Sequence, residues 1–202
     1  MNDKIYVYLS SLTGNTEKLA RGVLEILSRK NWLFSLHDNE LITSSDETGE
    51  LVILFFWCRR GNLDYASRVF LERCKNKKII AIGTMGGYPD SGYGSKVKTA
   101  VFQLISENNI CMGVFLSQGK IDIQRTEYRK TLPPEHPHYL NKEGIRRHEE
   151  SRRHPDQTDI ERAGAFLENK IMEYKAVNQV VCVDGEPCIQ CGMCSLPEKG
   201  KV

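Results

Sequence analysis

A polar loop with several hydroxyl side chains follows the first apolar segment of the chain. Its sequence is Ser11-Leu12-Thr13-Gly14-Asn15-Thr16, and apolar residues at helical spacing begin directly after it. The first turn of a helix carries backbone N–H groups without intrahelical partners, and the helix dipole is positive there. Together with the hydroxyls and with Gly14, which allows close backbone approach, these donors suit a phosphate group. The alternative interpretation is that Thr13 or Asn15 simply caps the helix.

A cysteine cluster occupies the C-terminal tail. Cys188, Cys191 and Cys194 form a Cys-x2-Cys-x2-Cys run that resembles the opening of the bacterial ferredoxin motif. Three thiolates at this spacing suit one [4Fe–4S] cluster, and Cys182 is available as the fourth ligand because no cysteine follows at the motif's next position. Such a cluster is typical of an anaerobe. A structural zinc site built from the same thiols, and a redox-active tail without metal, are the alternatives.

Composition and length restrict the class of protein. The chain has 202 residues, 40% of them hydrophobic and 27% charged, which fits one globular α/β domain with an appendage. A formal net charge of +2 is too small to favour nucleic acid as a partner. No apolar run approaches the ~20 residues of a membrane span, and the N-terminus lacks the pattern of a secretory signal. We therefore predict a cytoplasmic protein.

Strand-like and helical segments alternate along the chain. Short apolar segments rich in β-branched and aromatic residues predict strands, and apolar stripes with a 3.6-residue period predict helices between them. A helix is expected after the loop at 11–16. The other predicted elements are strands at 4–9, 32–37, 51–57, 78–84 and 110–116, and helices at 63–74, 95–108 and 158–176. This alternation implies right-handed crossovers and a doubly wound five-stranded parallel sheet.

Two segments exceed this minimal pattern. An insert of about residues 117–155 lies inside the predicted domain 1–176, and the cysteine tail occupies 177–202. The insert is basic, with nine Lys or Arg residues against six Asp or Glu residues, and it holds His136, His138, His148 and His154. The histidine spacing matches no helix-borne metal pair, so we predict a solvated or partner-binding loop. Its basic charge would help to dock an acidic redox partner.

The loop at 11–16 is similar to the FMN-phosphate motif of the flavodoxin family, Thr/Ser-x-Thr-Gly-x-Thr. It occurs at the family's position, directly after the first strand and before the first helix. Leu12 departs from many flavodoxins, which have a hydroxyl residue there, but its backbone N–H remains available. The resemblance covers roughly residues 4–116 and the last helix. It implies the strand order 2-1-3-4-5, with FMN bound outside the carboxyl ends of the strands.

The resemblance also implies that the flavin ring lies between two loops, 56–64 and 84–94. Their aromatic residues and glycines supply stacking and backbone hydrogen bonds for the ring edge. The ring-binding candidates are Trp57, Arg59, Gly61, Thr84, Gly86, Gly87, Tyr88, Gly92 and Tyr93. Gly61 matches the flavodoxin glycine whose peptide reorients near flavin N5 on reduction. A core role for Trp57, ordinary loop tyrosines and a solvated Arg59 are the alternatives.

The function that the flavodoxin resemblance implies is electron transfer. The chain would bind FMN, take electrons from a reductase and pass them to a partner redox enzyme. The first alternative is a flavodoxin-like FMN-dependent reductase or oxidase that acts directly on a quinone, porphyrin or bilin, since the chain also resembles the small flavodoxin-like companion of bacterial bilirubin reductase. The second is a binding module that keeps the fold without flavin. No nucleophile–base pair or carboxylate pair stands out, which argues against hydrolase chemistry.

Overall fold

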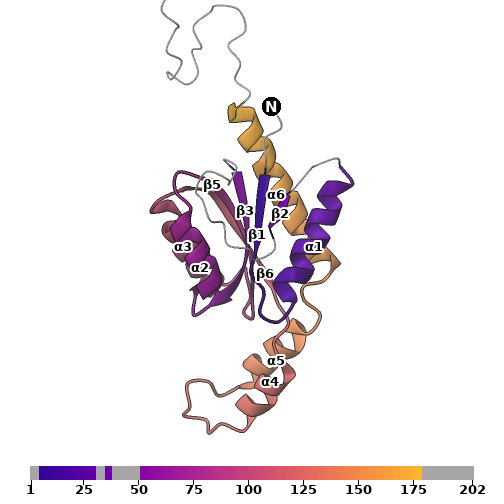
Figure 1. Cartoon of the computed structure of the whole chain (residues 1–202). Coiled ribbons are helices and arrows are strands. Elements are labelled where there is room, and N and C mark those ends of the chain that lie inside the picture. Colours follow the sequence, from indigo (N-terminus) through magenta and orange to yellow (C-terminus); the bar gives the residue numbers. More distant parts are fainter. Residues whose placement is uncertain (1–4, 31–34, 38–50, 179–202) are drawn as a thin grey trace, which may run out of the picture. The chain divides into compact units, whose positions relative to one another are not determined.

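A computed structural model of the chain describes residues 5–30, 35–37 and 51–178 (Figure 1). Its parallel strands follow the order β2-β1-β3-β5-β6, which is the predicted order 2-1-3-4-5. Their bounds are β1 (Ile5–Leu9), β2 (Ser35–His37), β3 (Leu51–Arg59), β5 (Lys78–Met85) and β6 (Ile110–Gln118). The prediction of five strands missed a sixth. This short strand, β4 (Asn62–Leu63), pairs antiparallel with the end of β3, so the helix predicted from residue 63 begins too early.

The central strand β3 is buried on both faces, as its continuous apolar sequence predicts. Phe55 lies opposite Leu9 of β1 and Ile82 of β5, which fixes the register of the three strands. Because side chains alternate along a strand, Phe56 points to the face opposite to that of Phe55. Phe56 belongs there to a cluster that includes Val97, so each face of the sheet carries its own core.

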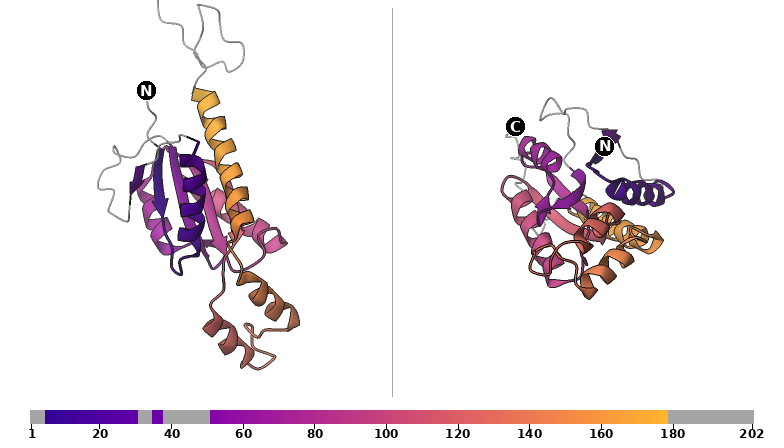
Figure 2. Two further views of the ribbon diagram at one scale, coloured as in Figure 1. Left: turned by 90° about the vertical axis from the view of Figure 1, so that its right-hand side faces the viewer. Right: turned by 90° about the horizontal axis from the view of Figure 1, so that it is seen from below.

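Helices cover both faces of the sheet (Figures 1 and 2). On one face lie α1 (Asn15–Ser28) and the first part of α6 (Gln157–Asn178). These two helices approach closely because Gly22 of α1 leaves room for the Ile160 side chain. On the other face lie α2 (Tyr65–Arg73) and α3 (Gly92–Ser106), whose apolar residues pack on β3 and β5. The arrangement brings the loops that follow β1, β3 and β5 to one edge of the sheet.

The insert forms helices, so the prediction of a solvated loop over 117–155 is wrong. Strand β6 continues to Gln118, and the helices α4 (Ile123–Lys130) and α5 (Lys142–Ser151) follow it. The Asp122 and Asn141 side chains cap their N-termini by accepting from the Gln124 and Gly144 N–H groups. Buried contacts between α4 and α5 then stabilise short polar helices that carry few apolar residues, which is why periodicity did not reveal them.

The described part of the chain ends at residue 178, before the cysteine tail. All four cysteines that were predicted to bind a metal lie outside the described residues. Within 5–30, 35–37 and 51–178, no helix is long and apolar enough to cross a membrane.

Candidate functional site

The loop after β1 presents a row of backbone N–H donors. Gly14 adopts a left-handed conformation with φ 78°, which turns the chain into α1 directly after the loop. No acceptor among the described residues bonds to the N–H groups of residues 12–16, whereas the Glu17 N–H donates to Ser11 Oγ at 3.3 Å. Consecutive free N–H groups at a helix N-terminus form an anion-binding concavity.

The side chains of this loop divide into exposed and buried ones. Leu12 is 70% exposed and Thr13 is exposed as well. Asn15 Nδ2 donates to Thr13 Oγ1 at 3.0 Å and to the Lys120 carbonyl at 2.9 Å, which ties the loop to the insert. Thr16 is buried, and its Oγ1 lies 2.8 Å from Thr84 Oγ1 behind the loop. Thr13 therefore lies on the open side of the loop, whereas Thr16 and Thr84 join α1 to β5.

Asp64 fastens the loop after β3 to the loop after β1. Its buried carboxylate accepts four hydrogen bonds, from Ser10 Oγ (2.8 Å), Ser67 N (3.0 Å), Ser67 Oγ (2.7 Å) and Trp57 N (3.3 Å). It also caps α2. Sequence analysis did not single out Asp64, although an acidic residue just before a helix and three residues before Ser67 is a signal for such a cap.

A tight hairpin connects β3 to β4. Arg59 pairs with Asn62, and the two residues between them have positive φ, 51° at Arg60 and 81° at Gly61. Two positive φ values characterise the type I′ turn of a two-residue hairpin. A Cβ atom on Gly61 would lie 3.4 Å from Tyr93 Oη, so the tip of the hairpin approaches the start of α3.

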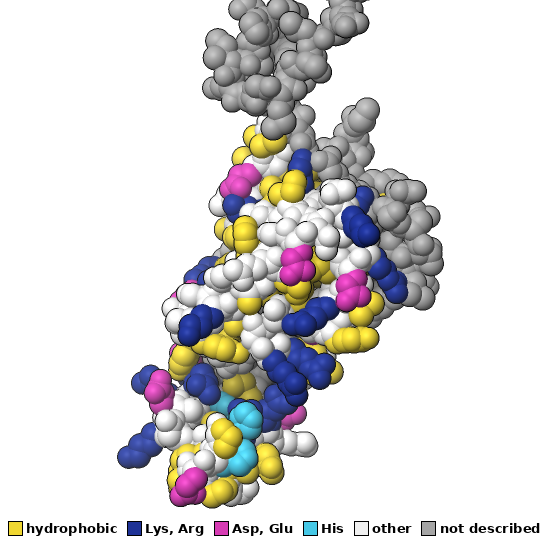
Figure 3. Space-filling view, turned by 90° about the vertical axis from the view of Figure 1, so that its left-hand side faces the viewer, with side chains coloured by type: hydrophobic (Ala, Val, Ile, Leu, Met, Phe, Trp, Pro, Cys, Tyr) yellow, Lys and Arg dark blue, Asp and Glu magenta, His cyan; other side chains and the backbone are white. Residues whose placement is uncertain are grey.

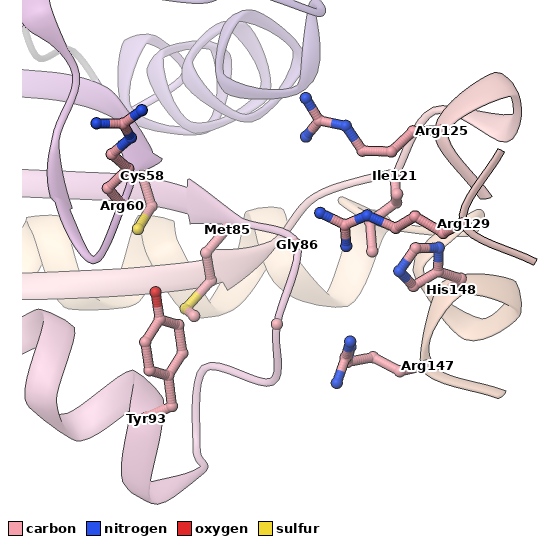
Figure 4. A pocket seen from close by; sticks show the side chains of 11 residues that line it. Cys58, Arg60, Met85, Gly86, Tyr93, Ile121, Arg125, Arg129, Arg147 and His148 are labelled. Atoms are coloured by element: carbon pink, nitrogen blue, oxygen red, sulfur yellow. The ribbon is translucent and has the colours of Figure 1, made fainter. Parts of the chain in front are cut away.

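A pocket of about 370 Å³ lies between this hairpin, the loop after β5 and the insert (Figure 4). Its size falls in the range of small-molecule sites. The lining residues on the sheet side are Cys58, Arg60, Met85, Gly86, Gly87 and Tyr93. Those on the insert side are Ile121, Arg125, Arg129, Arg147 and His148. Burial raises the pKa of the Cys58 thiol and of Tyr93, so both are protonated at neutral pH.

Some of the predicted ring-binding residues line the pocket and others do not. Gly86, Gly87 and Tyr93 line the pocket. Trp57 directly precedes Cys58 on β3, so its side chain points to the other face of the sheet. The remaining candidates are not among the lining residues: Arg59, Gly61, Thr84, Tyr88 and Gly92. Of these, Gly61 lies at the hairpin tip, Gly92 begins α3, and Arg59 is exposed.

Two hydrogen bonds join the insert to the end of β5 and the loop after it, and a third joins the two ends of the insert. The Gly119 N–H donates to the Met85 carbonyl at 2.8 Å, and the Ile121 N–H donates to Ser151 Oγ at 3.1 Å. Tyr88 Oη donates to Glu150 Oε2 at 2.8 Å, and this hydrogen bond raises the pKa of Tyr88. Tyr88 therefore tethers α5 to the loop after β5, a role that its sequence position did not reveal.

The insert side of the pocket is strongly positive. Arg125, Arg129 and Arg147 point into it, and Figure 3 shows Lys and Arg side chains gathered on this face of the molecule. Burial, with Arg125 and Arg147 nearby, lowers the pKa of Arg129. His148 is buried, and burial together with these arginines and Arg152 lowers its pKa to about 4. His148 is therefore neutral at pH 7.

Within residues 5–30, 35–37 and 51–178, one group of side chains of the types that bind metals occurs at the end of the insert. Ligand atoms of His154, Asp156 and Asp159 lie within 4.8 Å of one another. Their contacts are explained by the start of α6: Asp159 Oδ2 accepts from the Asp156 N–H at 2.8 Å and contacts His154 Nδ1 at 2.5 Å. This geometry is that of a helix N-terminus with reciprocal caps.

The comparisons with known proteins agree with this arrangement. Residues 6–168 match the Flavodoxin domain family. The chain is 32% identical over 179 residues to the flavodoxin-like domain-containing protein BilS of Clostridioides difficile (strain CD3), which covers 86% of this chain and 99% of that protein. The fold is also that of oxidised Flavodoxin 2 from Bacillus cereus, with a TM-score of 0.51, 16% identity, and coverage of 84% of this chain and 99% of the flavodoxin.

Proposed function

We propose that this chain, which belongs to the flavodoxin domain family, binds FMN and transfers electrons between a reductase and a partner redox enzyme. The observation that carries the proposal is the row of free N–H groups at residues 12–16. It lies at the same sheet edge as the pocket between the β3 hairpin and the loop after β5. In doubly wound sheets, cofactors bind at this edge, where the strand order reverses.

Each part of the site has a distinct task in this proposal. The N–H groups of residues 12–16 and the Ser11 and Thr13 hydroxyls hold the phosphate, and Asn15 keeps their loop in place through Lys120. Tyr93, Met85 and the hairpin tip at Gly61 wall the space for the ring. Bound FMN would supply one- and two-electron chemistry. The neutral Cys58 and Tyr93 add no negative charge beside the ring.

A titration of the purified full chain with FMN and with riboflavin tests the phosphate loop directly. Riboflavin has the same ring without the phosphate, so it should bind at least about tenfold more weakly, because the charge-assisted hydrogen bonds of the loop are lost. Flavin released by acid should amount to about one FMN per chain. A protein that stays colourless after FMN is added would refute the proposal.

A second candidate function is direct reduction or oxidation of a small conjugated molecule, such as a quinone, porphyrin or bilin. The observation that favours it is the insert, which supplies five of the eleven residues that line the pocket, four of them from α4 and α5. An electron carrier needs only an exposed ring edge. Oxidation of NADH or NADPH by the FMN-loaded chain with such an acceptor, in the absence of any partner protein, would distinguish the enzyme from the carrier.

The proposal includes a second redox group, in the cysteine tail. We propose that Cys182, Cys188, Cys191 and Cys194 hold a [4Fe–4S] cluster that relays single electrons, and the support is the ferredoxin-like spacing alone. Iron, sulfide and zinc should be quantified in anaerobically purified protein. About four iron atoms per chain would support the cluster, whereas one zinc per chain would assign the tail to a structural metal site.

A further inference from the structure

Arginine side chains converge on the pocket from two helices. Arg125 and Arg129 are four residues apart on α4, so they share one face of that helix, and Arg147 comes from α5. Figure 4 shows the three guanidinium groups directed at the pocket, with His148 between those of Arg129 and Arg147. Arg129 and Arg147 are partly buried, so their charges are only partly solvated.

These three positive charges are not neutralised by the surrounding protein. Within the described part of the chain, no carboxylate forms an ion pair with Arg125, Arg129 or Arg147. Other basic residues nearby behave differently, since Lys130 on the same helix α4 pairs with Glu127 at 3.0 Å. Like charges around one partly buried space repel each other, so an anion placed among them would be stabilised electrostatically.

His148 supplies a second, independent observation. Its side chain is 1% exposed and lines the pocket, and its Nε2 has no hydrogen-bond partner among the described residues. The other ring nitrogen, Nδ1, lies 2.8 Å from Thr126 Oγ1. A buried polar atom without a partner costs free energy, so such an atom in a pocket wall indicates a missing ligand.

We propose that Arg125, Arg129, Arg147 and His148 Nε2 form an oxyanion site for a carboxylate or phosphate of a small ligand. The apolar part of that ligand would lie against Ile121, beside the space that Met85 and Tyr93 wall for the ring. The depth of the site favours a small molecule over a protein partner, because His148 lies behind the arginines and is nearly inaccessible from the surface. The inference rests on the proposed function only where the ligand is taken to exchange electrons with FMN.

Thr126 explains how His148 would accommodate an oxyanion. Thr126 Oγ1 donates to the Asp122 carbonyl at 3.1 Å, so its single proton is used and His148 Nδ1 must donate to it. Nε2 of the neutral ring is then a bare acceptor that faces the arginines. An oxyanion at Nε2 requires a proton there, supplied by protonation of the ring or by a tautomer change in which the Thr126 hydroxyl turns from the Asp122 carbonyl and donates to Nδ1. The other titratable groups of the pocket, Cys58 and Tyr93, stay neutral at pH 7.

The test is calorimetry on the FMN-loaded full chain at fixed ionic strength, with three probes. 2-Naphthoate has an apolar body and one carboxylate, 2-naphthamide has the same body without charge, and inorganic phosphate has the charge without the body. FMN loading keeps the loop at 11–16 occupied, so phosphate cannot bind there. Naphthoate should bind at least about tenfold more tightly than naphthamide. Tighter binding of phosphate than of naphthoate would also support the site, and would identify its ligand as phosphate-bearing.

Matched variants locate the binding. Arg129→Gln with Arg147→Gln removes two positive charges from the pocket and should weaken naphthoate binding at least about tenfold. Arg153→Gln removes one positive charge from an exposed position outside the pocket and should change the affinity little. His148→Gln can place an amide near the Nε2 position, so it should keep most of the affinity. His148→Asn can replace only Nδ1 and should lose about fivefold. A merely structural histidine would give the same affinity in both His148 variants.

Several results would overturn the inference. These are equal binding of naphthoate and naphthamide, equal losses in the Arg153 variant and the double variant, or no binding of any probe. The outcome for FMN is read separately, from the flavin absorbance of the same samples. A chain that takes up no FMN but binds naphthoate through Arg129 and Arg147 refutes the proposed function and leaves this site standing. A chain that binds FMN normally but binds no anion refutes this site and leaves the proposed function standing.

Discussion

Replacement of Asp64 by alanine should destabilise the protein more than any other single change at a helix cap in the described structure. The substitution removes the cap of α2, which typically contributes about 1 kcal/mol. It also leaves the hydroxyls of Ser10 and Ser67 without their shared acceptor, at about 1–3 kcal/mol for each buried group. We therefore expect the free energy of unfolding to fall by about 3–7 kcal/mol.

Urea denaturation followed by far-ultraviolet circular dichroism measures this loss. Asp122→Ala is the matched control, because Asp122 caps α4 at an exposed position and accepts one side-chain hydrogen bond, from the Gln124 N–H at 2.7 Å. It should cost about 1 kcal/mol. If Asp64→Ala costs no more than Asp122→Ala at equal m-values, the four-bond network does not stabilise the site and the reasoning is refuted.

The same substitution should weaken FMN binding. Asp64 accepts hydrogen bonds from Ser10, which precedes the loop at 11–16, and from Trp57, which lies near the end of strand β3. Without the carboxylate the two loops lose their common anchor, and ordering them on binding costs extra free energy. Asp64→Asn keeps one oxygen for the Ser67 N–H and should give an FMN dissociation constant between those of the wild type and Asp64→Ala.

Three further predictions concern single residues. Gly14→Ala meets no steric clash, but φ 78° is strained for alanine, so stability should fall by about 1–2 kcal/mol and FMN titration should show weaker binding. Because the pKa of His148 is lowered to about 4 in the folded protein, the neutral ring contributes its full stabilisation above pH 6.5. The free energy of unfolding should fall by about 2 kcal/mol as the pH drops toward 4, after allowance for solvent in the pocket. The unfolding midpoint of His148→Asn should not show this fall. Tyr88→Phe should leave the unfolding midpoint nearly unchanged and speed hydrogen exchange in α5, as mass spectrometry would show.

Local sequence information was enough to predict the sheet and the loop at 11–16 with the helix that follows it. The run Leu51–Trp57 is apolar throughout, and only a strand buried on both faces accommodates such a sequence within a short α/β unit. The loop at 11–16 likewise depends on neighbouring residues, because Gly14 makes the turn and the first turn of α1 supplies the donors. The ends of the elements were predicted less accurately, because the hairpin at Arg60 and Gly61 is followed by strand β4, where a helix was predicted to begin.

The arginine side of the pocket depends on contacts that sequence spacing does not encode. Arg125 and Arg129 have helical spacing, which was a usable signal, but α4 has only one buried residue, Thr126, and so lacks an apolar stripe. Arg147 reaches the same pocket only because His148 packs on Thr126 and Ser151 bonds to the Ile121 N–H. Trp57 illustrates the same limit, since the exact length of β3 decides which residue of the strand end faces the pocket.

The insert connects the two proposed activities. Residues of α4 and α5 wall one side of the pocket, so only a small ligand fits between the insert and the proposed ring space. The side-chain tethers Tyr88–Glu150 and Asn15–Lys120 lie in exposed positions, where hydrogen bonds are exchanged readily with water. An anion among Arg125, Arg129 and Arg147 would relieve the repulsion among their charges. A bound oxyanion should therefore stabilise the packing of α4 against α5 and slow hydrogen exchange in both helices.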